Sequence, residues 1–226
     1  MKPLIGIISR VVYPGETGKM AVNEPVRSAV VRHGGNPICL LFPQDIDYTR
    51  VHLKDQPDLT LDDKEMIKRQ IDLCDGVLFP GGFRISKADK FILDYVLEKD
   101  IPVLGICLGM QTLASTGAES LTNEKIEPDP VHQSEEEYVH FVTLDKSSKL
   151  YQIIGKDRFM VNSRHSMKII PSDKYVVTSL SDDNVVESIE FPNKKYAIGV
   201  QWHPENLNDE ESNKILESFI KACKGE

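Results

Sequence analysis

Short apolar runs alternate with amphipathic segments along the first half of the chain. Residues 4–8 form a run rich in β-branched side chains, and residues 24–33 place apolar side chains at i, i+3 and i+4 before two glycines. A run of the first kind is typical of a buried strand, and spacing of the second kind is typical of a helix. By the same criteria we expect further strands at residues 38–42, 76–79 and 102–106, and further helices at residues 62–73, 87–99 and 108–114.

The pattern changes after residue 135, where short strand-like runs follow one another. Strands that alternate with helices predict an α/β fold, with a mostly parallel central sheet flanked by helices on both faces. The second half adds extra short antiparallel strands, and we expect residues 1–226 to form one domain. The strands expected there are residues 138–144, 175–179, 185–191 and 196–201, and residues 209–222 have the spacing of an amphipathic helix.

Composition and charge narrow the class of protein. The 226 residues are 40% hydrophobic and carry a formal net charge of -8. An acidic chain is a poor match for a phosphate backbone, so we expect no nucleic-acid partner. The chain has no run of 18 apolar residues, and its first apolar run is too short for the core of a secretion signal. These features predict a cytoplasmic protein without a membrane partner.

The sequence Gly-Ile-Cys-Leu-Gly at residues 105–109 joins an expected strand to an expected helix. This is the arrangement of a nucleophile elbow, with Cys107 in the place of a serine. The two glycines would remove Cβ atoms from a sharp turn, and the helix N-terminus would favour the thiolate. The N–H of Leu108 could then point at an oxyanion. On the pentapeptide alone, a buried structural cysteine is an equally good interpretation.

Two further motifs lie at the ends of expected strands. His203, Pro204 and Glu205 follow the strand at residues 196–201. They would supply a general base for a thiol and a carboxylate that orients it, although a His near a Glu is more often a surface pair. Residues 79–82, Phe-Pro-Gly-Gly, would leave backbone N–H groups open to a ligand at the same edge of the sheet, although such a sequence is usually a plain turn.

Together these segments resemble the class I, triad-type glutamine amidotransferase superfamily, and most closely its γ-glutamyl-γ-aminobutyrate hydrolase-like (peptidase C26) group. The resemblance implies a flavodoxin-like fold and a cysteine-dependent hydrolase of γ-glutamyl amide bonds. It also implies a γ-glutamyl thioester on Cys107, with His203 as base, Glu205 as its orienting carboxylate, and no metal or organic cofactor. The motifs that carry it are GVLFPGG at residues 76–82, PVLGICLGMQ at 102–111 and GVQWHPE at 199–205. The implied oxyanion and substrate-binding residues are Gly81, Gly82, Leu108, Gln111 and His165.

The resemblance leaves the substrate and the assembly open. The loop after Gly82 is shorter than is usual in the hydrolase group, and Val26 stands where that group usually has an aromatic side chain. A small γ-glutamyl substrate and a stand-alone enzyme are the first expectation. The alternatives are a glutaminase subunit that delivers ammonia to a separate synthase and, as a third possibility, a non-catalytic binding protein on the same fold. A homodimer is compatible with either catalytic alternative.

Weak signals for metal chemistry lie around an acidic run. Residues 134–137, Ser-Glu-Glu-Glu, are typical of a solvated loop, and His132 and His140 flank them. The four cysteines show no Cys-x-x-Cys spacing. We therefore expect reduced thiols and no metal site, and the sequence assigns no role to His132 or His140.

Overall fold

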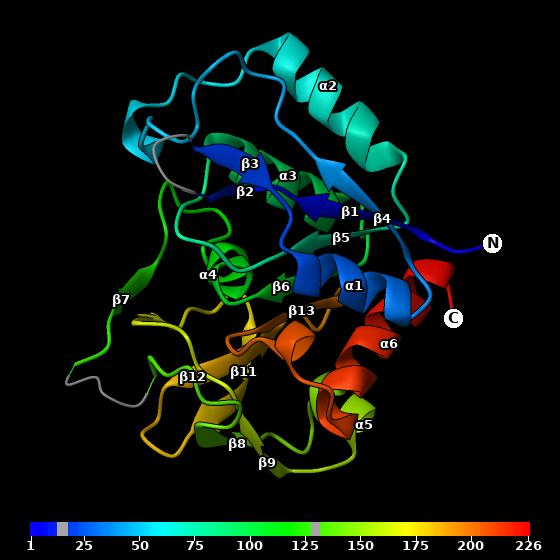
Figure 1. Ribbon diagram of the computed structural model, residues 1–226, viewed down its shortest axis with the longest axis vertical. Helices are drawn as coiled ribbons and strands as arrows, with labels where there is room; N and C mark the ends of the chain where they lie inside the picture. The colour runs from blue at the N-terminus through cyan, green and yellow to red at the C-terminus, as the bar shows by residue number, and fades with distance from the viewer. Residues whose placement is uncertain (13–17, 128–131) are drawn as a thin grey trace.

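A nine-stranded sheet runs through the protein in the computed structural model, which describes residues 1–12, 18–127 and 132–226 (Figure 1). In the order of the strands across the sheet, each neighbouring pair from β4 (Asn36–Leu40) to β13 (Ala197–Val200) is parallel. Each pair from β13 to the far edge strand β9 (Arg158–Val161) is antiparallel. The expected α/β class is confirmed, and the antiparallel strands of the second half extend the parallel sheet. In sheet order the strands are β4 (Asn36–Leu40), β1 (Leu4–Ile8), β5 (Gly76–Phe79), β6 (Val103–Ile106), β13 (Ala197–Val200), β12 (Val186–Glu190), β11 (Val176–Ser181), β8 (His140–Leu144) and β9 (Arg158–Val161).

Helices pack on both faces of this sheet and form two apolar cores. One core contains side chains of α1 (Glu24–Arg32), α5 (Lys149–Ile154) and α6 (Glu210–Lys224). The other contains side chains of α2 (Leu61–Asp72), α3 (Lys87–Glu98) and α4 (Leu108–Ala114). No helix of the described part of the chain is long and apolar enough to cross a bilayer. The shorter elements are β2 (Arg10–Val12), β3 (Lys19–Ala21), β7 (Asn123–Lys125), β10 (Met167–Ile169), and the 3-10 turns Leu53–Asp55 and Pro204–Asn206.

Side-chain caps explain where two of these helices begin. Thr60 and Asp63 cap α2, and Ser86 and Asp89 cap α3, each pair exchanging side-chain and backbone hydrogen bonds. Such a capping box satisfies N–H groups that the first turn of a helix leaves without partners. Asp89 is almost fully buried and has a second role at the active site, described below.

One predicted strand lies in a different environment from the one expected. We expected residues 38–42 to form a buried strand, whereas β4 covers Asn36–Leu40 at the edge of the sheet. Ile38 and Cys39 are exposed there. A single apolar run does not distinguish an edge strand from a central one, because the difference depends on which strands pair with it.

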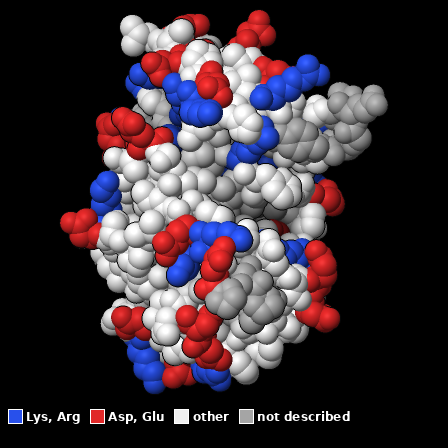
Figure 2. Space-filling model, turned by 90° about the vertical axis from the view of Figure 1, so that its left-hand side faces the viewer, with Lys and Arg blue, Asp and Glu red and all other residues white. Residues whose placement is uncertain are grey.

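The surface carries both signs of charge. On the face shown in Figure 2, Lys and Arg side chains lie among Asp and Glu side chains and form no continuous basic stripe. A binding surface for a phosphate backbone needs clustered cations. The expectation that no nucleic acid binds stays a prediction from composition.

Candidate active site

Cys107 lies in a sharp turn between β6 and α4. Its backbone has φ 53° and ψ -109°, a conformation that is costly for any residue with a side chain. A Cβ on Gly109 would lie 1.9 Å from the carbonyl oxygen of Phe79, and one on Gly105 would lie 2.8 Å from the carbonyl carbon of Gly109. The two glycines therefore allow α4 to start directly against β5, which is the reason expected for them from the sequence.

The His203 motif leaves the sheet beside this elbow. Val200, at the end of β13, pairs with Ile106 at the end of β6, and its carbonyl accepts a hydrogen bond of 2.8 Å from the N–H of Cys107. His203 Nδ1 lies 2.8 Å from Glu205 Oε1, and the Glu205 side chain is buried. Because Glu205 is buried beside the ring, the pair is not the surface ion pair that was the alternative interpretation. The structure thus brings the three proposed triad residues together.

The charges of this group favour a thiolate beside an imidazolium. Burial alone would raise the pKa of the Cys107 thiol, but a hydrogen bond with His203 and the positive charge of that ring outweigh it and hold the pKa below its ordinary value. Burial alone would lower the pKa of His203, but the Glu205 carboxylate and the contact with Cys107 raise it to about 10. Each group stabilises the charged form of the other, as in activated cysteine nucleophiles.

The thiolate should therefore survive at pH values where an ordinary thiol is protonated. We expect the rate of Cys107 alkylation by iodoacetamide to stay near its maximum as pH falls through the ordinary thiol range, and to drop only below the lowered pKa of the pair. In His203→Gln the burial remains without the cation, so the profile should move above the ordinary thiol pKa. The measurement is the alkylation rate of the Cys107 peptide against pH. A wild-type profile that rises at the ordinary thiol pKa would contradict the ion pair.

The loop after β5 packs against both catalytic side chains. A Cβ on Gly81 would lie 2.7 Å from His203 Cε1 and 3.5 Å from Cys107 Cβ. The N–H of Leu108 forms a hydrogen bond with the Cys107 sulfur. The Gly81–Gly82 turn and the N–H of Leu108 thus both lie close to Cys107, and their role as oxyanion donors stays a prediction.

A buried arginine that the sequence analysis missed supports this loop. Arg10 Nε donates a hydrogen bond of 3.1 Å to the carbonyl oxygen of Pro80, and Arg10 forms an ion pair with Asp89. The two side chains are 5% and 2% exposed. A Cβ on Gly82 would lie 3.0 Å from Arg10 Cδ. Arg10 is therefore a positioning residue for the loop, and no local motif pointed to it because 79 residues separate it from Asp89.

A second positioning residue holds the backbone of His203. The Asn162 side chain donates to the carbonyl oxygen of His203 at 2.9 Å and accepts from its N–H at 2.8 Å. Asn162 is buried and follows β9, so the antiparallel part of the sheet contributes directly to the position of His203, the expected base.

Removing the two hydrogen bonds between Asn162 and the His203 backbone, which we call the Asn162 clamp, should affect both activity and stability. We expect Asn162→Ala to lower kcat on the order of tenfold and to lower the free energy of unfolding by about 2 kcal/mol, because two partly buried backbone groups of His203 lose their partners. Asn193→Ala, at an exposed turn position, is the matched control and should change neither. Kinetics and thermal unfolding of the two variants check this. Wild-type kcat in Asn162→Ala would contradict a positioning role.

Two pockets adjoin at Cys107. One, of about 450 Å³, is lined by the N-terminus of α1 from Asn23 to Val26, by His203 and by Asn206. The other, of about 370 Å³, is lined by Gln111, Asn123 and His165. Gly82, Phe83, Cys107 and Arg164 line both. A substrate whose scissile bond lies at the sulfur would therefore extend in two directions, with only one of them facing the catalytic base.

Gln111 and His165 line the second pocket, as expected for residues near the substrate. The Gln111 amide oxygen accepts a hydrogen bond of 2.9 Å from Asn123, which fixes the orientation of the Gln111 side chain. His165 directs its Nδ1 to the carbonyl oxygen of Met167 at 3.0 Å and its Nε2 toward Glu187 at 3.5 Å. Both ring nitrogens thus have neighbours within the protein, and direct contact of His165 with the substrate stays a prediction.

The structure also gathers residues that could hold a metal ion. His132 and His140, whose role the sequence left open, lie beside His165 and Glu187 in a buried group. The acidic run at residues 134–137 supplies no member of this group, and Glu187 was not predicted because nothing in the local sequence marks it.

Comparisons with known proteins agree with this geometry. The peptidase C26 family model matches residues 84–205. A CTP synthase of Lactobacillus helveticus is 30% identical over 82% of this chain and 40% of its own length. The γ-glutamyl-γ-aminobutyrate hydrolase PuuD of Escherichia coli is 33% identical over 64% of this chain and 61% of its own length. The chain therefore spans less than two thirds of these two curated relatives.

Solved structures show the same fold. The glutaminase domain of Trypanosoma brucei CTP synthase with bound acivicin superposes with a TM-score of 0.68 at 15% identity, covering 99% of this chain and 94% of that domain. A glutamine amidotransferase of Thermotoga maritima gives a TM-score of 0.59 at 16% identity, covering 100% and 85% of the two chains. The family model covers more than half of the chain, including Cys107, His203 and Glu205. The chain belongs to the peptidase C26 family of the class I glutamine amidotransferase superfamily.

Proposed function

We propose that the protein hydrolyses γ-glutamyl amide bonds through a γ-glutamyl thioester on Cys107. The observation that carries the proposal is the strained, buried Cys107 with the His203–Glu205 pair of 2.8 Å beside it. Such strain persists in proteins where the surroundings enforce it, and it is concentrated at functional sites. A binding protein on the same fold would gain nothing from an activated thiolate, so this geometry favours catalysis.

The reaction has two steps. The Cys107 thiolate attacks the γ-carbonyl carbon, the C–N bond breaks, and the His203 imidazolium gives its proton to the departing amine. His203, now neutral, takes a proton from water, whose oxygen attacks the thioester and releases glutamate and the thiolate. Glu205 keeps the ring oriented and stabilises its charged form in both steps. The N–H groups of Gly82 and Leu108 would stabilise the oxyanion, each by roughly 3–4 kcal/mol.

The two pockets suggest where each half of the substrate binds. His203 must reach the leaving nitrogen, and it lines the pocket beside α1 but not the pocket beside Gln111. We assign the amine to the first pocket and the γ-glutamyl group to the second, where the resemblance places Gln111. Val26 stands where the hydrolase group usually has an aromatic side chain. It lines the amine pocket, where the leaving group would bind.

A panel of amides tests this function. The purified chain, without added proteins, would be incubated with glutamine, γ-glutamyl-γ-aminobutyrate, other γ-glutamyl amines and asparagine as the control one methylene shorter. We expect release of glutamate from at least one γ-glutamyl amide and none of the corresponding acid from asparagine. Wild-type protein that cleaves no member of the panel, alone or with added cell lysate, would contradict the proposal.

The second candidate function is a glutaminase subunit that delivers ammonia to a synthase. The similarity to CTP synthase over 82% of this chain favours it, as does Phe83, an 85% exposed aromatic side chain at the rim of both pockets. A partner that covered Phe83 would also enclose the released ammonia. If this alternative holds, glutamine hydrolysis by the purified chain should be slow and should rise when lysate is added, and Phe83→Ser should reduce the increase. Equal rates with and without lysate would favour the stand-alone enzyme.

A further inference from the structure

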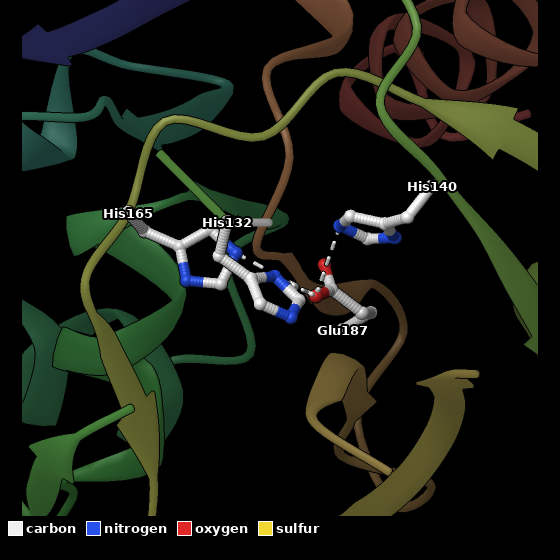
Figure 3. Close-up of side chains that lie close together, drawn as sticks. All are labelled: His132, His140, His165 and Glu187. Carbon is white, nitrogen blue, oxygen red and sulfur yellow. Dashed lines mark ion pairs between the residues drawn. The ribbon is translucent and has the colours of Figure 1, made fainter. Parts of the chain in front are cut away.

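Three histidines and a glutamate meet in the interior, beside the active site. His132 lies in the loop before β8, His140 starts β8, His165 lies between β9 and β10, and Glu187 belongs to β12. Figure 3 shows the three imidazole rings turned toward the Glu187 carboxylate. All four residues are buried, with exposed fractions of 1% for His132, 8% for His140, 4% for His165 and 0% for Glu187. Four titratable groups from distant parts of the sequence are thus removed from water together.

The distances between their polar atoms match the size of a tetrahedral metal site. Glu187 Oε1 lies 3.5 Å from His132 Nδ1, 3.6 Å from His140 Nε2 and 3.5 Å from His165 Nε2. One such atom from each residue lies within 4.8 Å of all the others. In a tetrahedral zinc site with bonds of about 2.0–2.2 Å, the ligand atoms lie roughly 3.3–3.6 Å apart. The carboxylate oxygen therefore already lies at the required separation from each ring, whereas ring nitrogens as much as 4.8 Å apart would have to approach one another by about 1 Å.

The hydrogen bonds of two rings direct acceptor nitrogens into this group. His140 Nδ1 lies 3.2 Å from the carbonyl oxygen of Phe141, and His165 Nδ1 lies 3.0 Å from that of Met167. A carbonyl oxygen only accepts, so each Nδ1 carries a hydrogen, and Nε2 is the nitrogen that faces Glu187. A nitrogen and a carboxylate oxygen that face each other need a proton or a metal cation between them.

His132 has the opposite orientation for the same reason. Its Nε2 lies 3.0 Å from Asp183 Oδ2, so that nitrogen carries the hydrogen and Nδ1 is the acceptor that faces Glu187. The Ser163 hydroxyl donates to the carbonyl oxygen of His132 at 3.0 Å, and its oxygen also lies 3.3 Å from His132 Nδ1, a contact that a metal ion at this nitrogen would replace. A carboxylate that holds the far nitrogen of a histidine is the usual outer partner of a metal ligand, because it fixes the ring and makes the ligating nitrogen more basic.

Four polar atoms of His140, His165 and Glu187 at this centre lack hydrogen-bond partners among the described residues. Within the described parts of the chain, His140 Nε2, His165 Nε2 and both carboxylate oxygens of Glu187 are buried without a hydrogen-bond partner. A buried carboxylate in this condition is strongly destabilising, and native interiors rarely contain one. A divalent cation would bind both imidazole nitrogens and the Oε1 oxygen of Glu187, and its charge would compensate that of the carboxylate.

We propose that His132, His140, His165 and Glu187 bind one divalent transition-metal ion, with Zn²⁺ the best match, in a closed tetrahedral site. Three imidazole nitrogens and one carboxylate oxygen are ligands that zinc accepts readily. Four protein ligands in a dry interior leave no open position for a substrate, which is the pattern of a structural site. From the sequence we expected no metal site, because no Cys-x-x-Cys spacing occurs and the acidic run at residues 134–137 is typical of a solvated loop.

The ion would stabilise one wall of the active site. His165 lines the pocket next to Cys107, and Asn162, three residues earlier, holds the backbone of His203. The carbonyl oxygen of Glu187 accepts a hydrogen bond of 2.8 Å from the N–H of Gln201, which lies two residues before His203. Metal binding would thus tie β8 to β12 and to the segment between β9 and β10, and the last two support the backbone around His203.

Metal binding can be measured without any assay of activity. Untagged full-length protein in a Cys107→Ala background, which removes the reactive thiol as a competing ligand, would be stripped with a chelator. It would then be titrated with Zn²⁺ against a chromophoric competitor and with Co²⁺ for its visible spectrum. We expect one Zn²⁺ per chain, a tetrahedral Co²⁺ spectrum without the charge-transfer band of a thiolate ligand, and a higher unfolding temperature with Zn²⁺ than without it.

Variants inside and outside the site complete the test. Glu187→Gln should weaken Zn²⁺ binding by roughly 100-fold or more, and Asp183→Asn, which changes only the outer partner of His132, by roughly 10–100-fold. His52→Asn replaces an exposed histidine and should bind as the parent does. Parent protein that binds no Zn²⁺, or Glu187→Gln that binds it as tightly as the parent, would overturn the proposal. If Glu187→Gln does not fold, the Zn²⁺ affinity of Asp183→Asn tests the proposal instead. The Asp183 side chain is 51% exposed, so this substitution removes no core atom, and Zn²⁺ binding as tight as in the parent would overturn the proposal.

Discussion

Replacing Cys107 with alanine is expected to lower kcat toward γ-glutamyl amides by about a thousandfold or more while leaving the fold intact. The thiolate forms the covalent intermediate, so its removal eliminates the two-step route instead of weakening one contact. Alanine keeps the Cβ that the turn already accommodates, and it removes only the sulfur from a side chain that is 7% exposed. The thermal unfolding temperature should therefore stay close to that of the wild type.

Cys39→Ala is the matched control for this experiment. Cys39 is an exposed thiol on the edge strand β4, outside both pockets, and its substitution should leave kcat unchanged. Glutamate release would be measured for both variants under identical conditions. Residual activity in Cys107→Ala above a hundredth of the wild-type value would show that another group performs the attack.

The second large effect is expected at Gly109, which follows the nucleophile by two residues. A Cβ there would lie 1.9 Å from the carbonyl oxygen of Phe79, a backbone atom that cannot move without displacing β5. We expect Gly109→Ala to lower the free energy of unfolding by at least about 3 kcal/mol, through overpacking. For a chain of this size that corresponds to a decrease in Tm of roughly 6–12 °C. Activity should fall as well, because the turn that carries Cys107 is displaced.

Gly155→Ala separates this clash from general effects of substituting a glycine. Gly155 ends α5 with φ 75°, and no atom lies within 4 Å of the position its Cβ would occupy. Only the left-handed backbone opposes a side chain there, at a cost of roughly 1–2 kcal/mol. Gly109, in contrast, lies inside α4, where helix propensity alone would favour alanine over glycine by about 1 kcal/mol. Any loss of stability in Gly109→Ala therefore comes from the clash with Phe79. A Gly109→Ala protein that is as stable as the wild type would show that the close approach of α4 and β5 is not required.

Local sequence predicted the elements that carry the nucleophile and the base. β1, β5 and α4 begin and end at the expected residues, and β6 and β13 are the expected strands shortened at their ends. These elements are fixed by short-range features: apolar runs of four or five residues, and a helix that starts directly after the nucleophile. The positions of Cys107 and of the His203–Glu205 pair could be inferred because each residue sits at the end of such a strand, and parallel strands bring their ends to one edge.

The supporting contacts could not be predicted because they join residues that are far apart in the chain. The Arg10–Asp89 pair and the clamp between Asn162 and His203 depend on which strands are neighbours and on their register. Glu187 is one of several acidic residues in its region, and only the fold shows that its carboxylate is buried among three histidines. Strand β9 and helix α5 were also missed, since neither has a pattern long enough to be recognised alone.

The central claim is that a γ-glutamyl group becomes attached to Cys107 during turnover, and mass spectrometry can test this directly. Protein mixed with an excess of a γ-glutamyl amide that it cleaves would be quenched in acid, which preserves a thioester, then digested and analysed peptide by peptide. The account predicts the added mass of one γ-glutamyl group on the peptide that contains Cys107, its loss on treatment with hydroxylamine, and its absence in Cys107→Ser. Turnover at an undiminished rate with the label on another residue would contradict it.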